Sequence, residues 1–184
     1  MLRSNLRYSI IEGSFFALMF GFGENYLTAL GVFLGYSALQ ISVLSSFPQL
    51  IAAISQLFSN DMAKAFGTMR MFCVVIAFVQ SMLWFLLIWI VQCTDSYIAI
   101  LIWSTAYFAI GNVIGPVWIS WVGYLVPPSL RSNYHANRNR TINFLIFLSI
   151  MAGGLILEAF SNNKVLGFSI MFAVAGVGRL LSSY

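Results

Sequence analysis

Long apolar runs separated by short polar breaks fill almost the whole sequence. Charged residues are absent from positions 25–60, 71–94, 96–130 and 141–157. A helix that crosses the hydrocarbon core of a bilayer needs about 20 apolar residues, so each run is long enough, or nearly so, to span a membrane. The breaks divide the chain into predicted helices at about residues 8–33, 39–58, 71–91, 97–125, 141–160 and 165–181. The pattern predicts an all-α fold, a single transmembrane bundle of six helices.

The composition excludes both a soluble and a disordered protein. Of the 184 residues, 60% are hydrophobic and 8% are charged, whereas soluble domains carry roughly 25% charged residues. The 17 Phe, 8 Tyr and 5 Trp are the opposite of the low-hydrophobicity signature of disorder. The first apolar run follows Arg3 and Arg7, as in a secretory signal peptide, but it is too long and lacks a small-residue cleavage site. We therefore expect it to remain as a helix.

The nine Lys and Arg residues predict the orientation of the bundle. With the N-terminus inside, six spans place only Lys164 on the outer side, and an excess of basic residues marks the cytoplasmic side. The residues predicted to lie inside are Arg3, Arg7, Lys64, Arg70, Arg131, Arg138, Arg140 and Arg179. We therefore expect both termini in the cytoplasm, and we interpret the net charge of +4 as contact with anionic lipid rather than with nucleic acid.

Glu24 is the acidic residue that lies deepest inside a predicted helix. An ionisable residue within the membrane is costly and is a functional candidate by default. On a continuous helix, its face would also carry Phe20, Thr28, Gly31 and Gly35. We interpret Glu24 as a residue for substrate or proton coupling in a polar cavity; a structural carboxylate hydrogen-bonded to another helix is the alternative.

Two other predicted helices carry polar stripes. The stripe of the second helix consists of Ser42, Ser45, Ser46, Gln49, Ala53, Gln56 and Asn60, and Pro48 lies within the same stretch. The stripe of the fourth consists of Thr105, Asn112, Pro116 and Ser120, with Gly111 and Gly115 spaced for close helix packing. Such stripes occur where helices meet each other or water, so a packing seam and a substrate path both remain open. The third helix offers only Gln80 and Ser81, and we expect it to face lipid.

The remaining ionisable residues suggest interfaces rather than chemistry. Glu12 lies close to Arg7 at the inner end of the first helix, where an ion-paired interfacial residue and a functional one are both open. His135 lies in a predicted Arg-rich inner loop and Glu158 near Lys164. The sequence contains no metal-ligand cluster, no phosphate-binding Gly-rich loop and no nucleophile with a plausible base. We therefore expect no enzyme activity, no metal and no cofactor.

The residues from Gly115 to Arg140 carry a resemblance to a known family. They contain Gly-Pro-x-Trp-x-x-Trp, then Leu-Val-Pro, an Arg, an aromatic residue and an Arg-x-Arg pair. This run is similar to the end of the fourth helix and the following cytoplasmic loop of bacterial major facilitator superfamily transporters. Further matches are Glu12-Gly13, Gly23-Glu24-Asn25-Tyr26, Leu44 to Leu57, and Gly153-Gly154. The loop from Lys64 to Arg70 departs from the family pattern, since it lacks the usual Asp-Arg.

The resemblance implies a function and its partners. Family members have two six-helix halves with the substrate site between them, so the chain resembles the N-terminal half, a fragment that lacks a C-terminal half or pairs with a second copy. We expect a permease of the bacterial inner membrane that moves a small solute by alternating access. The expected substrate or proton-coupling residues are Glu24, Asn25, Gln49 and Asn112. The expected inner-gate or headgroup contacts are Glu12, Arg131, Arg138 and Arg140. The alternative is a six-helix scaffold or partner-binding subunit that does not transport.

Overall fold

The protein is described by a computed structural model that covers residues 2–183, with side chains at 8–124, 126–129 and 131–183. This part of the chain is all-helical, with 88% of the residues in helices and no strands. Six stretches are long and apolar enough to cross a membrane. They are Tyr8–Phe33, Ala38–Gln56, Met69–Cys93, Tyr97–Tyr124, Arg131–Ala159 and Lys164–Ser182. The prediction of an all-α protein with six helices long and apolar enough to span a membrane is therefore confirmed.

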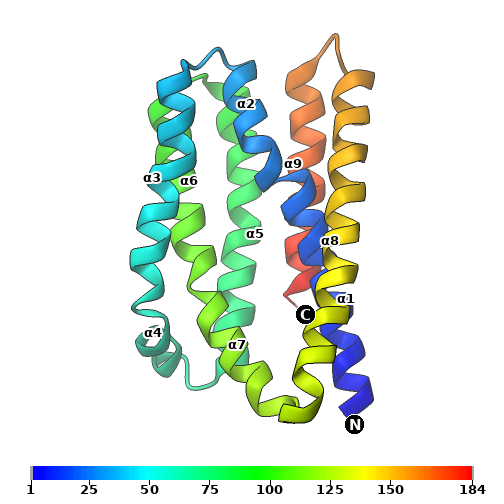
Figure 1. Ribbon diagram of the computed structural model, residues 1–184. Helices are drawn as coiled ribbons and strands as arrows, with labels where there is room; N and C mark the ends of the chain where they lie inside the picture. The colour runs from blue at the N-terminus through cyan, green and yellow to red at the C-terminus, as the bar shows by residue number, and fades with distance from the viewer. Residues whose placement is uncertain (1, 184) are drawn as a thin grey trace.

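Two of the spans, the first and the fourth, consist of more than one helix (Figure 1). The first is built from α1 (Leu2–Phe22), the 3₁₀ turn η1 (Glu24–Tyr26) and α2 (Leu27–Phe33). The second is α3 (Ala38–Gln56), followed by the short α4 (Ser59–Ala65), and the third is α5 (Met69–Cys93). The fourth consists of α6 (Tyr97–Asn112) and α7 (Ile114–Leu125), the fifth is α8 (Pro128–Ala159) and the sixth is α9 (Lys164–Ser182). The chain enters and leaves the bundle at the same end (Figure 1).

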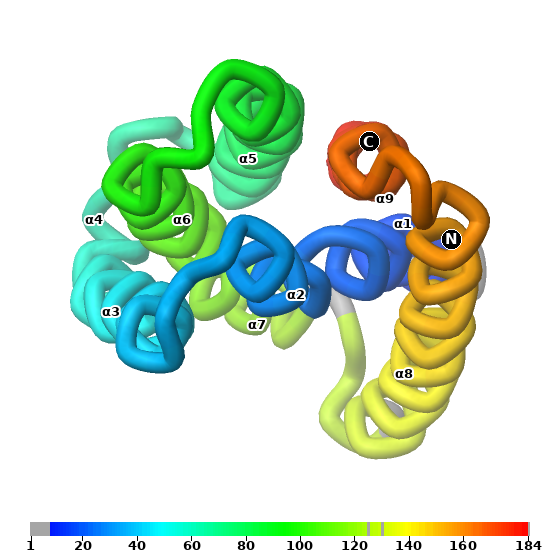
Figure 2. Tube along the Cα trace, turned by 90° about the horizontal axis from the view of Figure 1, so that it is seen from above, coloured from blue at the N-terminus to red at the C-terminus, as the bar shows by residue number. Residues whose placement is uncertain are grey.

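The helices pack as two groups that share a central contact. Helix α1 packs against α8 and α9, α3 packs against α6, and α5 joins the two groups through contacts with α9 and α6. Seen along the bundle, α3 and α8 lie far apart, and α2 lies between them (Figure 2). Within the apolar window of each span, only 17% of the residues of the second and fifth spans are buried, compared with 56% in the sixth. Helices α3 and α8 are thus the spans with the most uncovered surface.

An aromatic cluster fills the core between α5, α6 and α9. Trp84 is fully buried, with its ring centroid 4.9 Å from Tyr107, 5.4 Å from Trp103 and 5.5 Å from Phe172. Its indole also fills the space beside Gly23, where a Cβ atom would lie 2.4 Å from the ring. Only glycine leaves room for this ring at position 23. The aromatic cluster therefore packs directly against the residue at which the first span is interrupted.

The expectation of one continuous helix over residues 8–33 is wrong in this respect. Helix α1 ends at Phe22, and Gly23 has φ −102° and ψ −82°, which is not helical. Side chains near the break hold its backbone: Asn25 Nδ2 donates to the Phe20 carbonyl at 2.9 Å, and the Tyr26 hydroxyl donates to the Ile150 carbonyl of α8 at 2.5 Å. An interrupted helix is tolerated within a membrane when other groups satisfy the released backbone in this way.

The expectation that the third helix faces lipid is also wrong for one of its two faces. The buried residues of α5 recur every three or four positions from Phe72 to Val91 and include both Gln80 and Ser81. They pack against α9 and α6. The opposite face exposes apolar side chains such as Phe78, Met82 and Phe85. The apolar composition of α5 does not distinguish its buried face from its exposed face, because lipid and protein core both favour apolar side chains.

The fifth helix begins earlier than predicted. Helix α8 starts at Pro128 rather than near residue 141. Proline suits the first turn of a helix, where its missing N–H leaves no hydrogen bond unmade. The expected inner loop is therefore mostly the first turns of α8, and the basic residues Arg131, Arg138 and Arg140 lie on that helix.

The turn between α2 and α3 is tied to the turn between α5 and α6. Outside the spans, the Tyr36 hydroxyl donates to the Asp95 carbonyl at 3.0 Å, and the Tyr36 and Tyr97 rings meet edge to face. Burial, and then the Asp95 carboxylate and Tyr97, raise the pKa of the Tyr36 phenol above its ordinary value. Ser37 and Gln40 form a capping box that starts α3.

Candidate functional site

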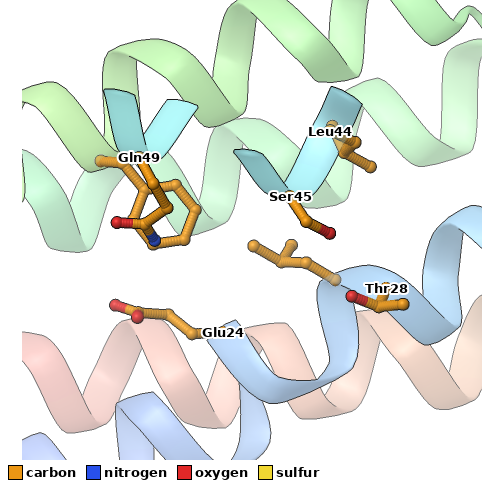
Figure 3. A pocket seen from close by; sticks show the side chains of 7 residues that line it. Glu24, Thr28, Leu44, Ser45 and Gln49 are labelled. Carbon is orange, nitrogen blue, oxygen red and sulfur yellow. The ribbon is translucent and has the colours of Figure 1, made fainter. Parts of the chain in front are cut away.

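A polar pocket lies beside the break in the first span. Its volume is about 140 Å³, and Figure 3 shows its lining side chains. They come from the first, second and fourth spans and are Glu24, Leu27, Thr28, Leu44, Ser45, Gln49 and Phe108. The break turns the chain at Gly23 so that Glu24 and Thr28 line this pocket together with two polar residues of α3.

Glu24 is held from the core side by a tyrosine. The Tyr107 hydroxyl donates to Glu24 Oε1 at 2.9 Å, and Tyr107 is itself fully buried. On the other side, the carboxylate points across the pocket toward the Gln49 amide (Figure 3). The two ion pairs in the described part of the chain are Arg138–Glu12 and Lys64–Asp61, so neither of them involves Glu24. The carboxylate therefore has a fixed position and no basic partner at ion-pair distance within that part.

Of the four predicted coupling residues, the structure brings only Glu24 and Gln49 into this pocket. The Asn25 side chain turns back to the Phe20 carbonyl. Asn112 lies at the end of α6, where its Nδ2 donates to the Phe108 carbonyl at 2.9 Å and its Oδ1 accepts from Gln56 Nε2 at 3.2 Å. Asn25 and Asn112 therefore support the surrounding helices and do not line the pocket.

The polar stripe of the second span divides into two parts. Toward α4 it is a packing seam, since the Ser55 hydroxyl donates to the Ala109 carbonyl at 2.9 Å and Gln56 bonds to Asn112 of α6. Nearer the start of α3, Ser42, Ser45 and Ser46 are exposed, and each donates to the carbonyl four residues before it. The packing seam is therefore observed in one part of the stripe, and the other part is exposed.

The two glycines of the fourth span, Gly111 and Gly115, differ in how closely they are packed. A Cβ atom at Gly111 would lie 2.1 Å from Gln80 Nε2, whereas nothing lies within 4 Å of one at Gly115. Close packing thus explains Gly111 and leaves Gly115 unexplained.

The predicted inner-gate residues form contacts among α1, α7 and α8. Glu12 Oε2 accepts from Arg138 Nη2 at 2.9 Å, and the Arg138 guanidinium lies 4.2 Å from the centre of the Trp118 ring. Arg131 Nε donates to the Val126 carbonyl at 2.9 Å, and its Nη2 donates to the Gly123 carbonyl, so Arg131 caps the end of α7. Arg140 is exposed.

A buried polar cluster around Arg179 was not predicted from the sequence, in which Arg179 was interpreted only as an inner-side charge. Arg179 is 5% exposed; its Nε donates to Gln80 Oε1 at 2.7 Å and its Nη1 to Ser182 Oγ at 3.3 Å. The Ser182 hydroxyl in turn donates to Glu12 Oε1 at 3.1 Å. The signal was present in the sequence, because Arg179 falls inside the predicted helix 165–181, where an ionisable residue needs a partner.

The structure was also examined for a second pocket and for a group of metal ligands. A second hollow of about 460 Å³ lies where α4 meets α7 and is lined by residues that include Lys64, Met69 and Tyr124. Among the described residues, no group of three or more His, Cys, Asp or Glu side chains could hold a metal ion. Of these two pockets, the Glu24 pocket is the one that is lined by a carboxylate from a membrane span, and we take it as the candidate functional site.

Comparison of the chain with known proteins gives no match: no protein-family model fits it, and no curated protein or solved structure is significantly similar to it.

Proposed function

We propose that the chain is the N-terminal six-helix half of a facilitator-type secondary transporter and that the Glu24 pocket is part of its substrate or coupling site. The observation that carries the proposal is the position of Glu24, which lies in the interior of the span Tyr8–Phe33, beside a break in the helix and in a pocket. With a rise of 1.5 Å per residue, Glu24 lies about 14 Å along the span from Phe33 and about 24 Å from Tyr8. Carboxylates at such depth mark ion and substrate pathways in membrane proteins.

The uncovered polar surface around the pocket supports a partner for this half. Asn25, Thr28, Ser45 and Gln49 are all exposed although they lie within membrane spans. Polar side chains are poorly placed against lipid tails, so this face of α2 and α3 meets water or protein. A second six-helix unit, either a C-terminal half or a second copy of this chain, would close the cavity between them.

The distribution of basic residues supports the orientation. The excess of Lys and Arg near one end of the bundle favours cytoplasmic termini, and the resemblance to bacterial transporters favours a location in the bacterial inner membrane. In this orientation the Arg138–Glu12 pair and Arg131 lie on the cytoplasmic side. They would join α1, α7 and α8 there as the inner gate, with Arg140 at the lipid headgroups.

One observation favours the alternative of a scaffold or partner-binding subunit. Part of the polar stripe is a helix seam, as the Ser55–Ala109 and Gln56–Asn112 bonds demonstrate. The scaffold function predicts that the remaining polar face is covered permanently by a partner and carries no solute.

The test is solute uptake with a matched pair of variants. Cells that express the full reading frame are incubated with a defined mixture of small solutes, and accumulation is followed by mass spectrometry at several external pH values. We expect at least one solute to accumulate with the wild type and with Glu158→Gln, whose exposed carboxylate lies at the outer end of α8, and not with Glu24→Gln. Equal accumulation with Glu24→Gln, or no accumulation by the wild type, would contradict the proposal.

A further inference from the structure

We infer that the Glu24 pocket binds a monovalent cation, either an inorganic ion of sodium type or the ammonium group of a solute. The inference rests on the proposed function, since it names the charge that the same site takes. It stands on three observations: a carboxylate without an ion-pair partner in the described part of the chain, a set of side chains that offer oxygen lone pairs, and a pocket of matching size.

The carboxylate of the site makes no ion pair within the described part of the chain. Glu24 Oε1 accepts from Tyr107, and Oε2 has no hydrogen-bond partner there. No Lys, Arg or His lines the pocket. Arg179, the buried cation of α9, gives its hydrogen bonds to Gln80 and Ser182 instead. A negative site without a basic residue attracts cations and repels anions.

The other polar side chains offer oxygen atoms with free lone pairs. The Ser45 hydroxyl uses its hydrogen on the Ile41 carbonyl at 3.0 Å, so its remaining capacity is to accept. Thr28 and Gln49 make no side-chain hydrogen bonds with the described residues, and each carries an oxygen acceptor. Carboxylate, hydroxyl and amide oxygens are the ligands that hard cations prefer. An anion would instead need N–H donors, and the Gln49 amide is the single side-chain N–H donor that lines the pocket.

The three polar neighbours come from two elements on opposite sides of the pocket. Thr28 is one helical turn after Glu24 on α2, and Ser45 and Gln49 are one turn apart on α3. Figure 3 shows the Glu24 and Gln49 head groups facing each other across the space. An occupant between them would draw the broken first span and α3 together.

The size of the pocket limits the occupant. Its volume of about 140 Å³ is close to that of an engineered cavity of roughly 150 Å³ that admits benzene. A sodium ion with a few waters or a methylammonium group fits this space. The rest of a larger solute would extend over the exposed side of α3, where Leu50 lies.

The test measures equilibrium binding and needs no transport. The purified full chain in lipid nanodiscs is heated in sodium chloride, methylammonium chloride or N-methylglucamine chloride at equal ionic strength. A ligand that binds the folded state raises the unfolding temperature in a saturable way. We expect sodium or methylammonium to do so relative to N-methylglucamine, and the cation that acts identifies the source of the charge.

Two serines of α3 provide a matched pair of variants. Ser45 and Ser46 are both exposed, and both donate to the carbonyl four residues earlier, but only Ser45 lines the pocket. We expect Ser45→Ala to weaken cation binding roughly tenfold, as for one lost contact with a charged group, and Ser46→Ala to leave it unchanged. Glu24→Gln should abolish it, and the serine pair keeps the test valid if that variant does not fold.

The outcomes separate this inference from the proposed function. If neither cation acts differently from N-methylglucamine, or if Ser45→Ala and Ser46→Ala behave alike, the cation site is wrong. Solute uptake that still depends on Glu24 would then leave the transport function standing with a proton as the coupling ion. Cation binding without any solute uptake would instead support the site and count against the transporter.

Discussion

The buried Arg179 cluster leads to a prediction that can be worked from the structure. Gln80 is 4% exposed and Arg179 is 5% exposed, and a hydrogen bond of 2.7 Å joins them inside the bundle. Gln80→Leu keeps a side chain of similar size and removes the acceptor. The net value of a hydrogen bond to a charged group is about 1.5–3 kcal/mol, which corresponds to roughly a 10- to 150-fold decrease in the ratio of folded to unfolded protein.

A residue on the same helix supplies the control. Gln92 of α5 is exposed, and its Nε2 lies 3.5 Å from Ser169 Oγ, at the limit of a hydrogen bond. Gln92→Leu should therefore change the stability by less than about 0.5 kcal/mol. Both variants are measured by unfolding with sodium dodecyl sulfate in mixed micelles, followed by circular dichroism.

The double variant Gln80→Leu/Arg179→Met tests the reason for the loss. When both partners become apolar, no buried group is left without its partner at this contact, so the double variant should lose at least about 1 kcal/mol less than the sum of the two single variants. Additive losses, or a Gln80→Leu loss no larger than that of Gln92→Leu, would refute the argument.

Three further predictions use matched positions. Gly111→Ala should lower stability because its Cβ atom would displace the Gln80 side chain, whereas Gly115→Ala should be tolerated; thermal unfolding in detergent compares them. Glu12→Gln should lower stability by about 1–3 kcal/mol because its arginine partner is only 12% exposed, whereas Asp61→Asn, from an ion pair more than 75% exposed, should leave it unchanged in the same assay. Because the raised pKa of Tyr36 favours the neutral phenol in the folded state, stability should fall as the pH rises above about 10, and Tyr36→Phe should reduce this fall in a pH series of unfolding curves.

The sequence predicted the class of fold because the membrane constrains it strongly. Uncharged runs of helical length leave few alternatives to spanning helices. Their approximate limits followed from the polar breaks, except at α8, where residues 128–140 carry enough charge to resemble a loop but belong to the helix.

The sequence could not predict which face of each helix is buried. In a membrane, lipid-facing and buried positions are both apolar, so periodicity loses the contrast that it has in a soluble protein. For that reason α5 was expected to face lipid, although Gln80 and Trp84 are among its buried residues. The break at Gly23 was missed as well, and the Trp84 ring that packs against this glycine comes from another span, a contact that the sequence does not show.

The candidate site was found in part because charge is rare in this chain. Glu24 was identified by its depth alone, and the structure adds its partner Tyr107 and its neighbours in the pocket. Tyr107 could not be chosen in advance, because one tyrosine among 8 in an apolar sequence gives no sign of its partner. Asn25 was expected at the site from the resemblance, and its side chain bonds to the Phe20 carbonyl instead.

The most direct test of the transport proposal asks whether the Glu24 pocket is reached by water from both sides of the membrane. Ser45→Cys is introduced into a chain with Cys73→Ala and Cys93→Ser, and sealed vesicles of each orientation are treated with a membrane-impermeant maleimide. Phe78→Cys, on the exposed apolar face of α5, serves as the lipid-facing control. Alternating access predicts that Ser45→Cys is labelled from both sides and that Phe78→Cys is labelled from neither. Labelling of Ser45→Cys from one side alone, or from neither, would contradict it.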